Sequence, residues 1–186
     1  VNSGEYKLMG LAPYGEPTYK ELILKELIDL KEDGSFKLNQ KYFNYATGLT
    51  MTNKNFANLF KLQRKKSKDD FKKEHLNLAS SIQKVTEEII LKIVKYTSDN
   101  YNCQNLCLAG GVALNCVANQ KILLSKYFKK IWIQPASGDA GACIGAALNA
   151  WYLHLKKERQ IIKPDSMHNS LLGPEFSNNE IEEYLK

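Results

Sequence analysis

The sequence predicts a mixed α/β domain. Its second half twice repeats the order of a short apolar strand, a glycine-containing loop and a helix, over residues 106–127 and 131–157. Before these units, residues 70–96 place apolar side chains at three- and four-residue steps, which is the spacing of a long amphipathic helix. Strand, loop and helix units of this kind are typical of nucleotide-binding α/β folds.

The first forty residues are predicted to form a loop, a helix and a strand. Residues 7–15 read KLMGLAPYG and end in a Pro-Tyr-Gly turn signal, so a loop is expected there. Apolar residues near helical spacing predict a helix over residues 19–30. Asp33-Gly34 then predicts a turn into a short alternating strand over residues 35–38.

The long helix carries an apolar stripe that we expect to face a core. Its members are Leu78, Ile82, Val85, Ile89, Ile93 and Tyr96.

The two strand, loop and helix units follow this helix. In the first, residues 106–109 form the strand, Gly110-Gly111 break it, and residues 112–127 resume as a helix. In the second, a strand over residues 131–133 precedes a helix rich in small residues over 140–157. Small residues on that helix would allow close approach to a neighbouring backbone.

Length and composition predict one soluble domain. The 186 residues are 44% hydrophobic and 25% charged with 5 prolines, which excludes collagen, wholesale disorder and a disulfide-stapled miniprotein. Neither a run of eighteen apolar residues nor a signal-like start occurs, so no membrane partner is expected and a cytoplasmic protein is predicted. The first residue is not Met, which indicates a piece of a longer protein.

The cysteines and histidines do not form a metal motif. Without a C-x-x-C pair, the cysteines are expected to be reduced, buried thiols: Cys103, Cys107, Cys116 and Cys143. The histidines are too scattered for an H-x-x-x-H pair: His75, His154 and His168. Most ligands of any metal must therefore come from elsewhere.

Most of the net charge lies in one basic segment. The chain carries 26 basic and 20 acidic residues, hence +6, and residues 61–73 hold seven basic residues against two aspartates, hence +5. Such a run could bind nucleic acid, but only Phe71 offers a stacking ring. A solvated loop or helix start is favoured, and nucleic acid is not expected as a partner.

The Gly110-Gly111 loop is the first candidate binding site. Glycines between a strand and a helix let a phosphate or ribose approach the backbone, and free helix amides favour anions. The pair matches neither G-x-G-x-x-G nor the P-loop pattern, so a plain turn is the alternative. Asn115 could bind a ligand's hydroxyl groups or could be a surface residue.

Asp139 is the second candidate, within the sequence SGDAG. It could cap the following helix or bind a metal or magnesium phosphate at a strand's carboxyl end. Lys7 could offer a point charge to a phosphate or be one of many surface lysines. Local sequence leaves these alternatives open.

Five segments together resemble the O-carbamoyltransferase family, which includes the nodulation-factor, tobramycin and cephalosporin carbamoyltransferases. In chain order they are EYKLMGLAPYG (5–15), ASSIQ with TEE (79–83 and 86–88), LAGGVALNC (108–116), QPASGDAG with GAA (134–141 and 145–147) and LGPEF (172–176).

This resemblance implies an actin-like (ribonuclease-H-like) ATPase fold, of which the chain would be the C-terminal half. Residues 1–176 would belong to this carbamoyl-transfer domain, and 177–186 to its edge or to a linker toward an absent C-terminal adenylating domain. That second domain would join the carbamoyl group of carbamoyl phosphate to adenylate from ATP. The actin-like domain would then pass the group from carbamoyladenylate to a hydroxyl of a small molecule or sugar.

The family pattern also implies roles for single residues. Asp139 matches a ligand of an iron-type divalent metal that the family also holds through two histidines of an H-x-x-x-H motif. Gly110, Gly111 and Asn115 match the adenosine-contacting segment, and Gly138 would shape the loop that presents Asp139. No catalytic residue is assigned.

Two matches are incomplete. Lys7 falls in a segment that lines the same cleft in the family, without an assigned role, and Arg64 follows Gln63 where the family has proline. The H-x-x-x-H motif is missing, so the N-terminal half-domain is expected outside this chain and the fragment alone is not expected to catalyse transfer or to hold the metal. The alternative is a transfer-RNA threonylcarbamoyladenosine-type transferase or another actin-like ATPase, although MGLAPYG favours the small-molecule branch.

Overall fold

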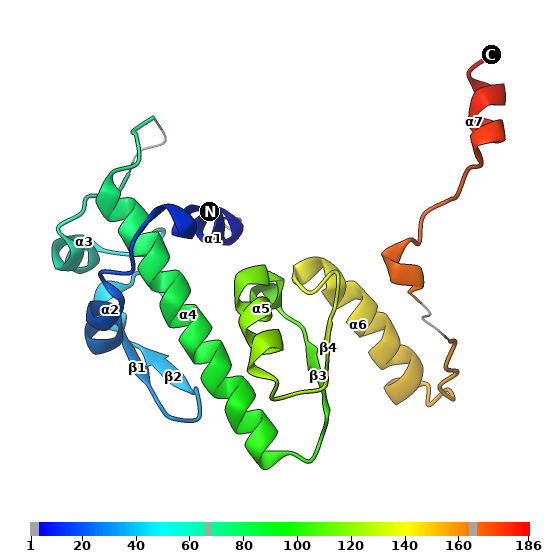
Figure 1. Ribbon diagram of the computed structural model, residues 1–186, viewed down its shortest axis with the longest axis horizontal. Coiled ribbons are helices and arrows are strands. Elements are labelled where there is room, and N and C mark those ends of the chain that lie inside the picture. Colours follow the sequence, from blue (N-terminus) through cyan, green and yellow to red (C-terminus); the bar gives the residue numbers. More distant parts are fainter. Residues whose placement is uncertain (1–3, 66–67, 164–166) are drawn as a thin grey trace. The chain divides into compact units, whose positions relative to one another are not determined.

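The computed structural model describes residues 4–65, 68–163 and 167–186 of the chain (Figure 1). The described residues combine α-helices with two two-stranded sheets, which confirms the predicted mixed α/β class. The chain divides into two compact units, one ending at Gln134 and the other beginning at Pro135. Among the helices described, none has the length and apolar character needed to cross a membrane.

The first unit is built around one long helix, α4. Its helices are α1 (Glu5–Leu11), α2 (Lys20–Glu26), α3 (Lys54–Phe60), α4 (Lys73–Asn100) and α5 (Cys116–Ser125). Its strands are β1 (Ile28–Leu30), β2 (Phe36–Leu38), β3 (Asn105–Leu108) and β4 (Lys130–Ile133). β1 pairs with β2 antiparallel, and β3 pairs with β4 parallel.

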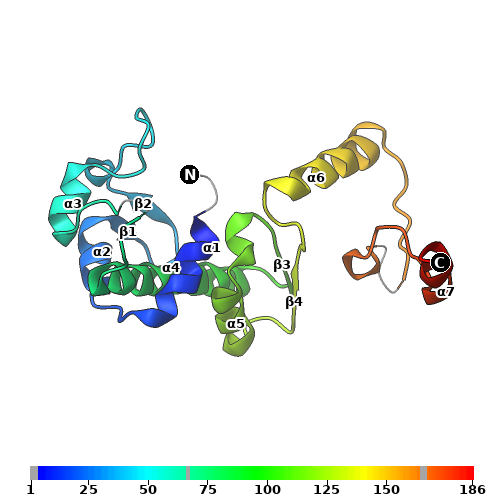
Figure 2. The same ribbon diagram turned by 90° about the horizontal axis from the view of Figure 1, so that it is seen from above.

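Helix α4 separates two apolar clusters, and Figure 2 shows the elements of each on either side of it. The first joins α2, the β1–β2 hairpin and α3 to α4 through Ile23, Leu27, Ile28, Tyr42, Phe60, Val85 and Ile89. The second joins α5 and the β3–β4 sheet to α4 through Val94, Ile122 and Phe128. The long helix is thus confirmed, and it begins three residues later than predicted.

The predicted apolar stripe is confirmed in part. Val85 and Ile89 are buried in the first cluster, and Leu78 and Ile82 pack against it. Ile93 is 42% exposed, so the stripe does not face a core along its whole length.

The loop predicted for residues 7–15 is wrong over most of that range. Helix α1 extends through Leu11, and a 3-10 turn over Ala12–Tyr14 follows it. Glu, Lys, Leu and Met are good helix formers, and the proline comes only after the helix has ended.

The helix predicted for residues 19–30 ends early. Its last three residues, Ile28–Leu30, form β1 instead. Apolar, acidic and apolar residues alternate there with the period of a strand, and pairing with β2 satisfies their backbone groups. The turn predicted at Asp33-Gly34 is confirmed, because Gly34 has φ +84° and leads into β2.

Both predicted strands of the later units are confirmed as β3 and β4. The helix predicted for residues 112–127 is interrupted, because a 3-10 turn, η3 (Gly111–Leu114), precedes α5. Asn115 lies at the break and begins α5 as its N-cap.

The second unit contains the 3-10 turn η4 (Asp139–Gly141), α6 (Ala142–Asn149) and α7 (Asn178–Tyr184). A π-helical turn over Ala150–His154 extends α6, so the helix predicted to residue 157 is shorter than expected. Ser137 is the only buried residue in the described part of this unit.

The prediction of buried cysteines is wrong. The four thiols are free, but Cys103, Cys107, Cys116 and Cys143 are all exposed. Cys107 shows the reason: it alternates with the half-buried Leu106 and Leu108 on β3, and it lies opposite the exposed Trp132 of β4 on the other face of the sheet.

The described part of the basic segment is a largely exposed connection between α3 and α4, as predicted; Lys66 and Ser67 lie outside the described residues.

Candidate functional site

The glycine loop follows β3 directly and turns the chain into η3. Gly110 has φ +98°, a conformation that side-chain-bearing residues rarely adopt, and its carbonyl accepts a hydrogen bond from the Ala113 amide at 3.0 Å. A Cβ at Gly110 or Gly111 would meet no atom within 4 Å. The space beside this loop is therefore open on the described part of the chain, and Gly110 is required by its backbone conformation.

This difference between the two glycines is testable. Gly110→Ala is expected to lower the free energy of unfolding by about 1–2 kcal/mol, because alanine is strained at positive φ. Gly111→Ala, which has open space and no positive φ, is expected to change it by less than about 0.5 kcal/mol. Urea denaturation of both variants measures this, and equal stabilities would contradict the assigned loop conformation.

Asn115 caps helix α5. Its side-chain Oδ1 accepts a hydrogen bond from the Ala118 backbone amide at 3.0 Å. An asparagine cap satisfies one of the amides at a helix start that lack a partner within the helix, and the remaining amides and the helix dipole favour a negatively charged group. Asn115 is therefore a structural residue of the loop as well as a candidate ligand contact.

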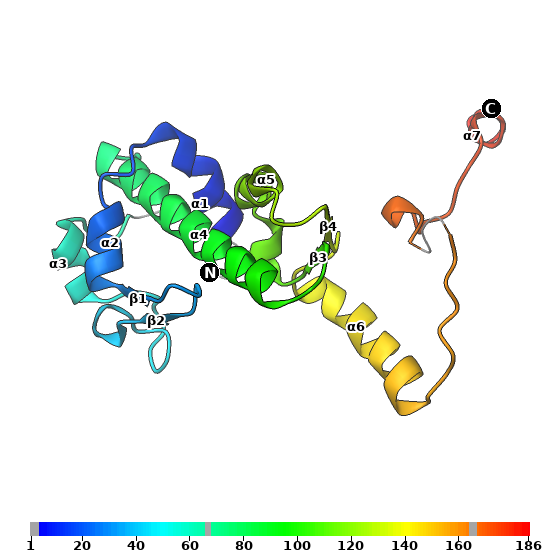
Figure 3. The same cartoon turned by 60° about the horizontal axis from the view of Figure 1, so that its bottom comes forward.

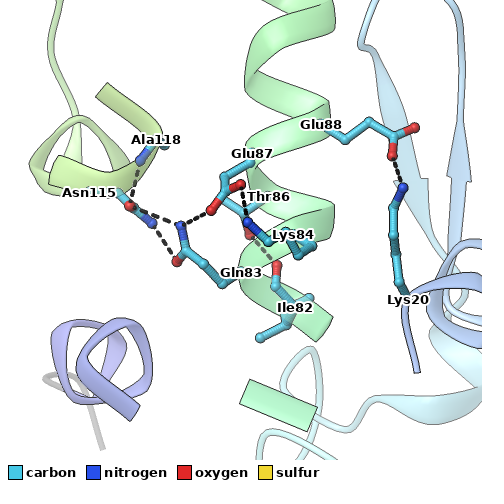
Figure 4. Close-up of polar contacts among 9 residues, drawn as sticks. All are labelled: Lys20, Ile82, Gln83, Lys84, Thr86, Glu87, Glu88, Asn115 and Ala118. Carbon is cyan, nitrogen blue, oxygen red and sulfur yellow. Dashed lines mark hydrogen bonds and ion pairs between the residues drawn. The ribbon is translucent and has the colours of Figure 1, made fainter. Parts of the chain in front are cut away.

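A buried polar network from α4 holds Asn115 (Figure 4). Asn115 Nδ2 donates to Gln83 Oε1 at 3.0 Å, and Gln83 Nε2 donates to Asn115 Oδ1 at 3.2 Å and to Glu87 Oε1 at 3.2 Å. Glu87 Oε2 pairs with Lys84 Nζ at 3.0 Å. Gln83 and Glu87 are only 7% and 6% exposed.

Neither Gln83 nor Glu87 is a predicted site residue, although both lie in the segment ASSIQ with TEE that contributes to the family resemblance. One signal was present: both are polar, they lie four residues apart on one helix face, and each is close in sequence to the apolar stripe of α4. Their partner Asn115 is 32 residues from Gln83, so no local pattern could have paired them.

Helix α1 lies against α4 and reaches α5, as Figure 3 shows. The Met9 and Cys116 sulfurs are 4.0 Å apart, so the KLMGLAPYG segment adjoins the start of the capped helix. Lys7 is exposed on α1, and its Nζ lies 5.7 Å from the centroid of the Tyr6 ring. That Lys7 lines a ligand cleft stays a prediction.

A cavity of about 520 Å³ borders this network, with Lys84, Glu87 and Lys121 among its lining residues. Another, of about 800 Å³, is lined by residues of α2, the β1–β2 hairpin and α4, and none of the predicted site residues lines either cavity. The smaller cavity shares Lys84 and Glu87 with the polar network that holds Asn115.

Asp139 and Gly138 belong to the second unit. Gly138, not Asp139, occupies the N-cap position of η4, so the capping alternative for Asp139 is wrong. Asp139 is exposed at the start of that turn. Gly138 has φ −77°, which any residue adopts, whereas a Cβ at Gly141 would lie 1.9 Å from the Ala136 carbonyl oxygen. Gly141 is thus the glycine that this loop requires.

The described residues do not fit an iron-type metal by themselves. In the part of the chain that the structure describes, no group of three or more histidine, cysteine, aspartate or glutamate side chains could hold a metal ion. Asp139 supplies a single exposed carboxylate, and an oxygen ligand alone does not hold a transition metal firmly. Arg64 is exposed after α3 and has no assigned role.

Comparison with known proteins identifies relatives along the whole chain. The model of a family described as "Carbamoyltransferase N-terminus" matches residues 1–148. The chain is 59% identical over 186 residues to an uncharacterized protein of Synechocystis sp., covering 100% of this chain and 30% of that protein. It is 35% identical over 144 residues to nodulation protein NolNO of Sinorhizobium fredii and 33% identical over 144 residues to nodulation protein NolO of Bradyrhizobium diazoefficiens, covering 77% of this chain in each case.

The chain spans less than a third of the length of these relatives, namely 30%, 20% and 24%. The matched description is that of an N-terminal region, which corrects the predicted placement in a C-terminal half. The shared segments show which proteins are related to this chain, but they do not show where in a longer protein the chain lies.

Proposed function

Because this chain belongs to the carbamoyltransferase N-terminus family, we propose that it supplies part of a domain that transfers a carbamoyl group to a hydroxyl. The donor is carbamoyladenylate, made elsewhere in the protein from carbamoyl phosphate, water and ATP with release of phosphate and pyrophosphate. The acceptor is a small molecule or a sugar, and AMP leaves when its hydroxyl takes the carbamoyl group. The domain has the actin-like ATPase fold, and other parts of the polypeptide complete its site.

The observation that carries this proposal is the glycine loop with its capped helix. Gly110 and Gly111 leave open space beside the backbone at the end of β3, and Asn115 holds the start of α5 next to them. Strand-end loops that lead into a helix N-terminus are common sites for the phosphate and ribose of a nucleotide. This loop accordingly binds the adenylate part of the donor.

The side chains of this chain bind and orient the donor. The backbone of the Gly110–Gly111 loop approaches the nucleotide closely, and Asn115 contacts it through an amide whose direction the network fixes. Lys7, which lies on α1, attracts the phosphate of the adenylate. Asp139 offers one carboxylate to a metal site whose remaining ligands the described residues do not supply.

An assay of the polypeptide that carries this chain tests the proposal. We expect AMP and pyrophosphate to form from ATP only when carbamoyl phosphate is present, together with a carbamoylated hydroxyl compound when a suitable acceptor is added. Chromatography detects AMP by its absorbance and the carbamoylated product by the label of carbamoyl phosphate that is radiolabelled in its carbon. AMP formation that instead requires threonine and bicarbonate, with radiolabelled threonine entering transfer RNA, would assign the chain to the threonylcarbamoyl branch.

A further inference from the structure

The two amides at the site form a symmetric pair. Asn115 and Gln83 each donate one hydrogen bond to the other and accept one in return. Turning both amides by 180° exchanges every oxygen with a nitrogen and preserves both bonds. The pair alone therefore does not determine which atom of Asn115 faces α5.

The two ends of the network remove this symmetry. The Ala118 backbone amide is a donor, so it requires the oxygen of Asn115, which lies 3.0 Å away. The Glu87 carboxylate is an acceptor, so it requires the nitrogen of Gln83, which lies 3.2 Å away. Both ends select the same arrangement.

We infer that Glu87 is a positioning residue for the nucleotide site: its buried carboxylate fixes the amide of Gln83, which in turn fixes the amide of Asn115. The identity of the ligand as a nucleotide rests on the proposed function, whereas the hydrogen bonds among Glu87, Gln83 and Asn115 do not depend on it. Lys84 holds the second carboxylate oxygen at 3.0 Å, so Glu87 itself has a fixed direction. The carboxylate acts on the loop only through the two amides.

A specific ligand chemistry follows. Asn115 Oδ1 already accepts bonds from Ala118 and Gln83, and its Nδ2 donates to Gln83. An amide nitrogen carries two hydrogens, so among the described residues one N–H of Asn115 remains to donate to a ligand. Asn115 thus recognises an acceptor atom, such as a ribose oxygen or an adenine ring nitrogen.

Glu87→Gln tests the role of the carboxylate. The substitution keeps the size of the side chain, but a glutamine can present either a donor or an acceptor to Gln83, so the direction of the two amides is then selected from the Ala118 end alone. We expect faster hydrogen exchange of the Ala118 amide and an affinity for AMP lowered about tenfold.

Glu88→Gln is the matched control. Glu88 is the next residue of α4 but points away from the network, where it pairs with Lys20 at 2.8 Å (Figure 4). That hydrogen bond raises the pKa of Lys20. We expect wild-type exchange at Ala118 and wild-type affinity for AMP in this variant.

Asn115→Asp separates capping from ligand recognition. An aspartate still accepts the Ala118 amide but has no N–H to donate. We expect a protected Ala118 amide together with weakened AMP binding, whereas a purely structural role for residue 115 predicts unchanged AMP affinity.

Two measurements on the polypeptide that carries this chain decide the inference: hydrogen exchange over residues 116–125 and calorimetric titration with AMP. Wild-type exchange and wild-type AMP affinity in Glu87→Gln would overturn the role of Glu87. If the unaltered protein does not bind AMP, the proposed function fails, while exchange at Ala118 in Glu87→Gln still supports or refutes the positioning role. If Glu87→Gln does not fold, unchanged AMP affinity in Asn115→Asp would overturn the inference.

Discussion

Replacing Asp139 by alanine is expected, on its proposed role as a metal ligand, to lower carbamoyl transfer on the order of 100-fold or more, because the loss of a ligand weakens binding of the metal. The same variant is expected to lose its bound metal. Folding should be unaffected, since the Asp139 side chain is exposed and caps no helix.

Elemental analysis of the purified polypeptide, together with its melting temperature, measures these effects. Glu158→Ala is the control, because Glu158 is another exposed acid of the same unit and lies after the helical segment that follows η4. A full metal content in Asp139→Ala would refute the assignment of this carboxylate as a ligand.

Replacing Gly15 by alanine is expected to destabilise the protein by about 3 kcal/mol. A Cβ at Gly15 would lie 2.1 Å from both the carbonyl carbon and the carbonyl oxygen of Leu76, which belong to the backbone of α4 and cannot turn aside as a flexible side chain could. The last glycine of the KLMGLAPYG segment therefore lets the chain after α1 pass against the first turn of α4.

Gly10→Ala is the matched control from the same segment. Gly10 lies within α1, and a Cβ there meets no atom within 4 Å. Alanine should therefore stabilise the protein by about 0.5–1 kcal/mol through its higher helix propensity. Urea denaturation distinguishes the two variants, and a Gly15→Ala protein as stable as the wild type would refute the close packing.

The elements that sequence predicted best are those with strong periodicity. Helix α4 and strands β3 and β4 were predicted within a few residues, because their apolar patterns are long or are bounded by glycine and polar residues. The boundary between helix and strand within residues 19–30 was not predicted, since the apolar residues there suit a helix and a strand equally. Pairing of β1 with β2, which is a tertiary effect, decided the end of α2.

The candidate site was predictable only in its local parts. Gly110 and Gly111 stand out because they separate a predicted strand from a predicted helix, and Asn115 follows them within the same six residues. Gln83 and Glu87 did not, since a polar residue in an amphipathic helix is usually solvated, and only the fold shows that both are buried against Asn115.

The resemblance of five segments to a known family gave a more specific functional prediction than apolar periodicity and loop composition did. The family that the chain belongs to was recognised from five short segments, and the match over residues 1–148 confirms it. The predicted position of the chain in a C-terminal half was wrong. Short motifs reflect constraints of chemistry and packing, but they do not indicate how far along a longer protein they lie. The same limit applies to Asp139, because the sequence around it does not indicate which other residues would bind the proposed metal.

Photolabelling with 8-azido-ATP tests most directly whether the glycine loop held by α4 is a nucleotide site. The polypeptide that carries this chain is irradiated with the probe, with and without excess AMP, and its labelled peptides are identified by mass spectrometry. We predict label within residues 108–119 that excess AMP prevents. Label that AMP does not displace, or AMP-sensitive label confined to other parts of the polypeptide, would contradict the assignment of this loop.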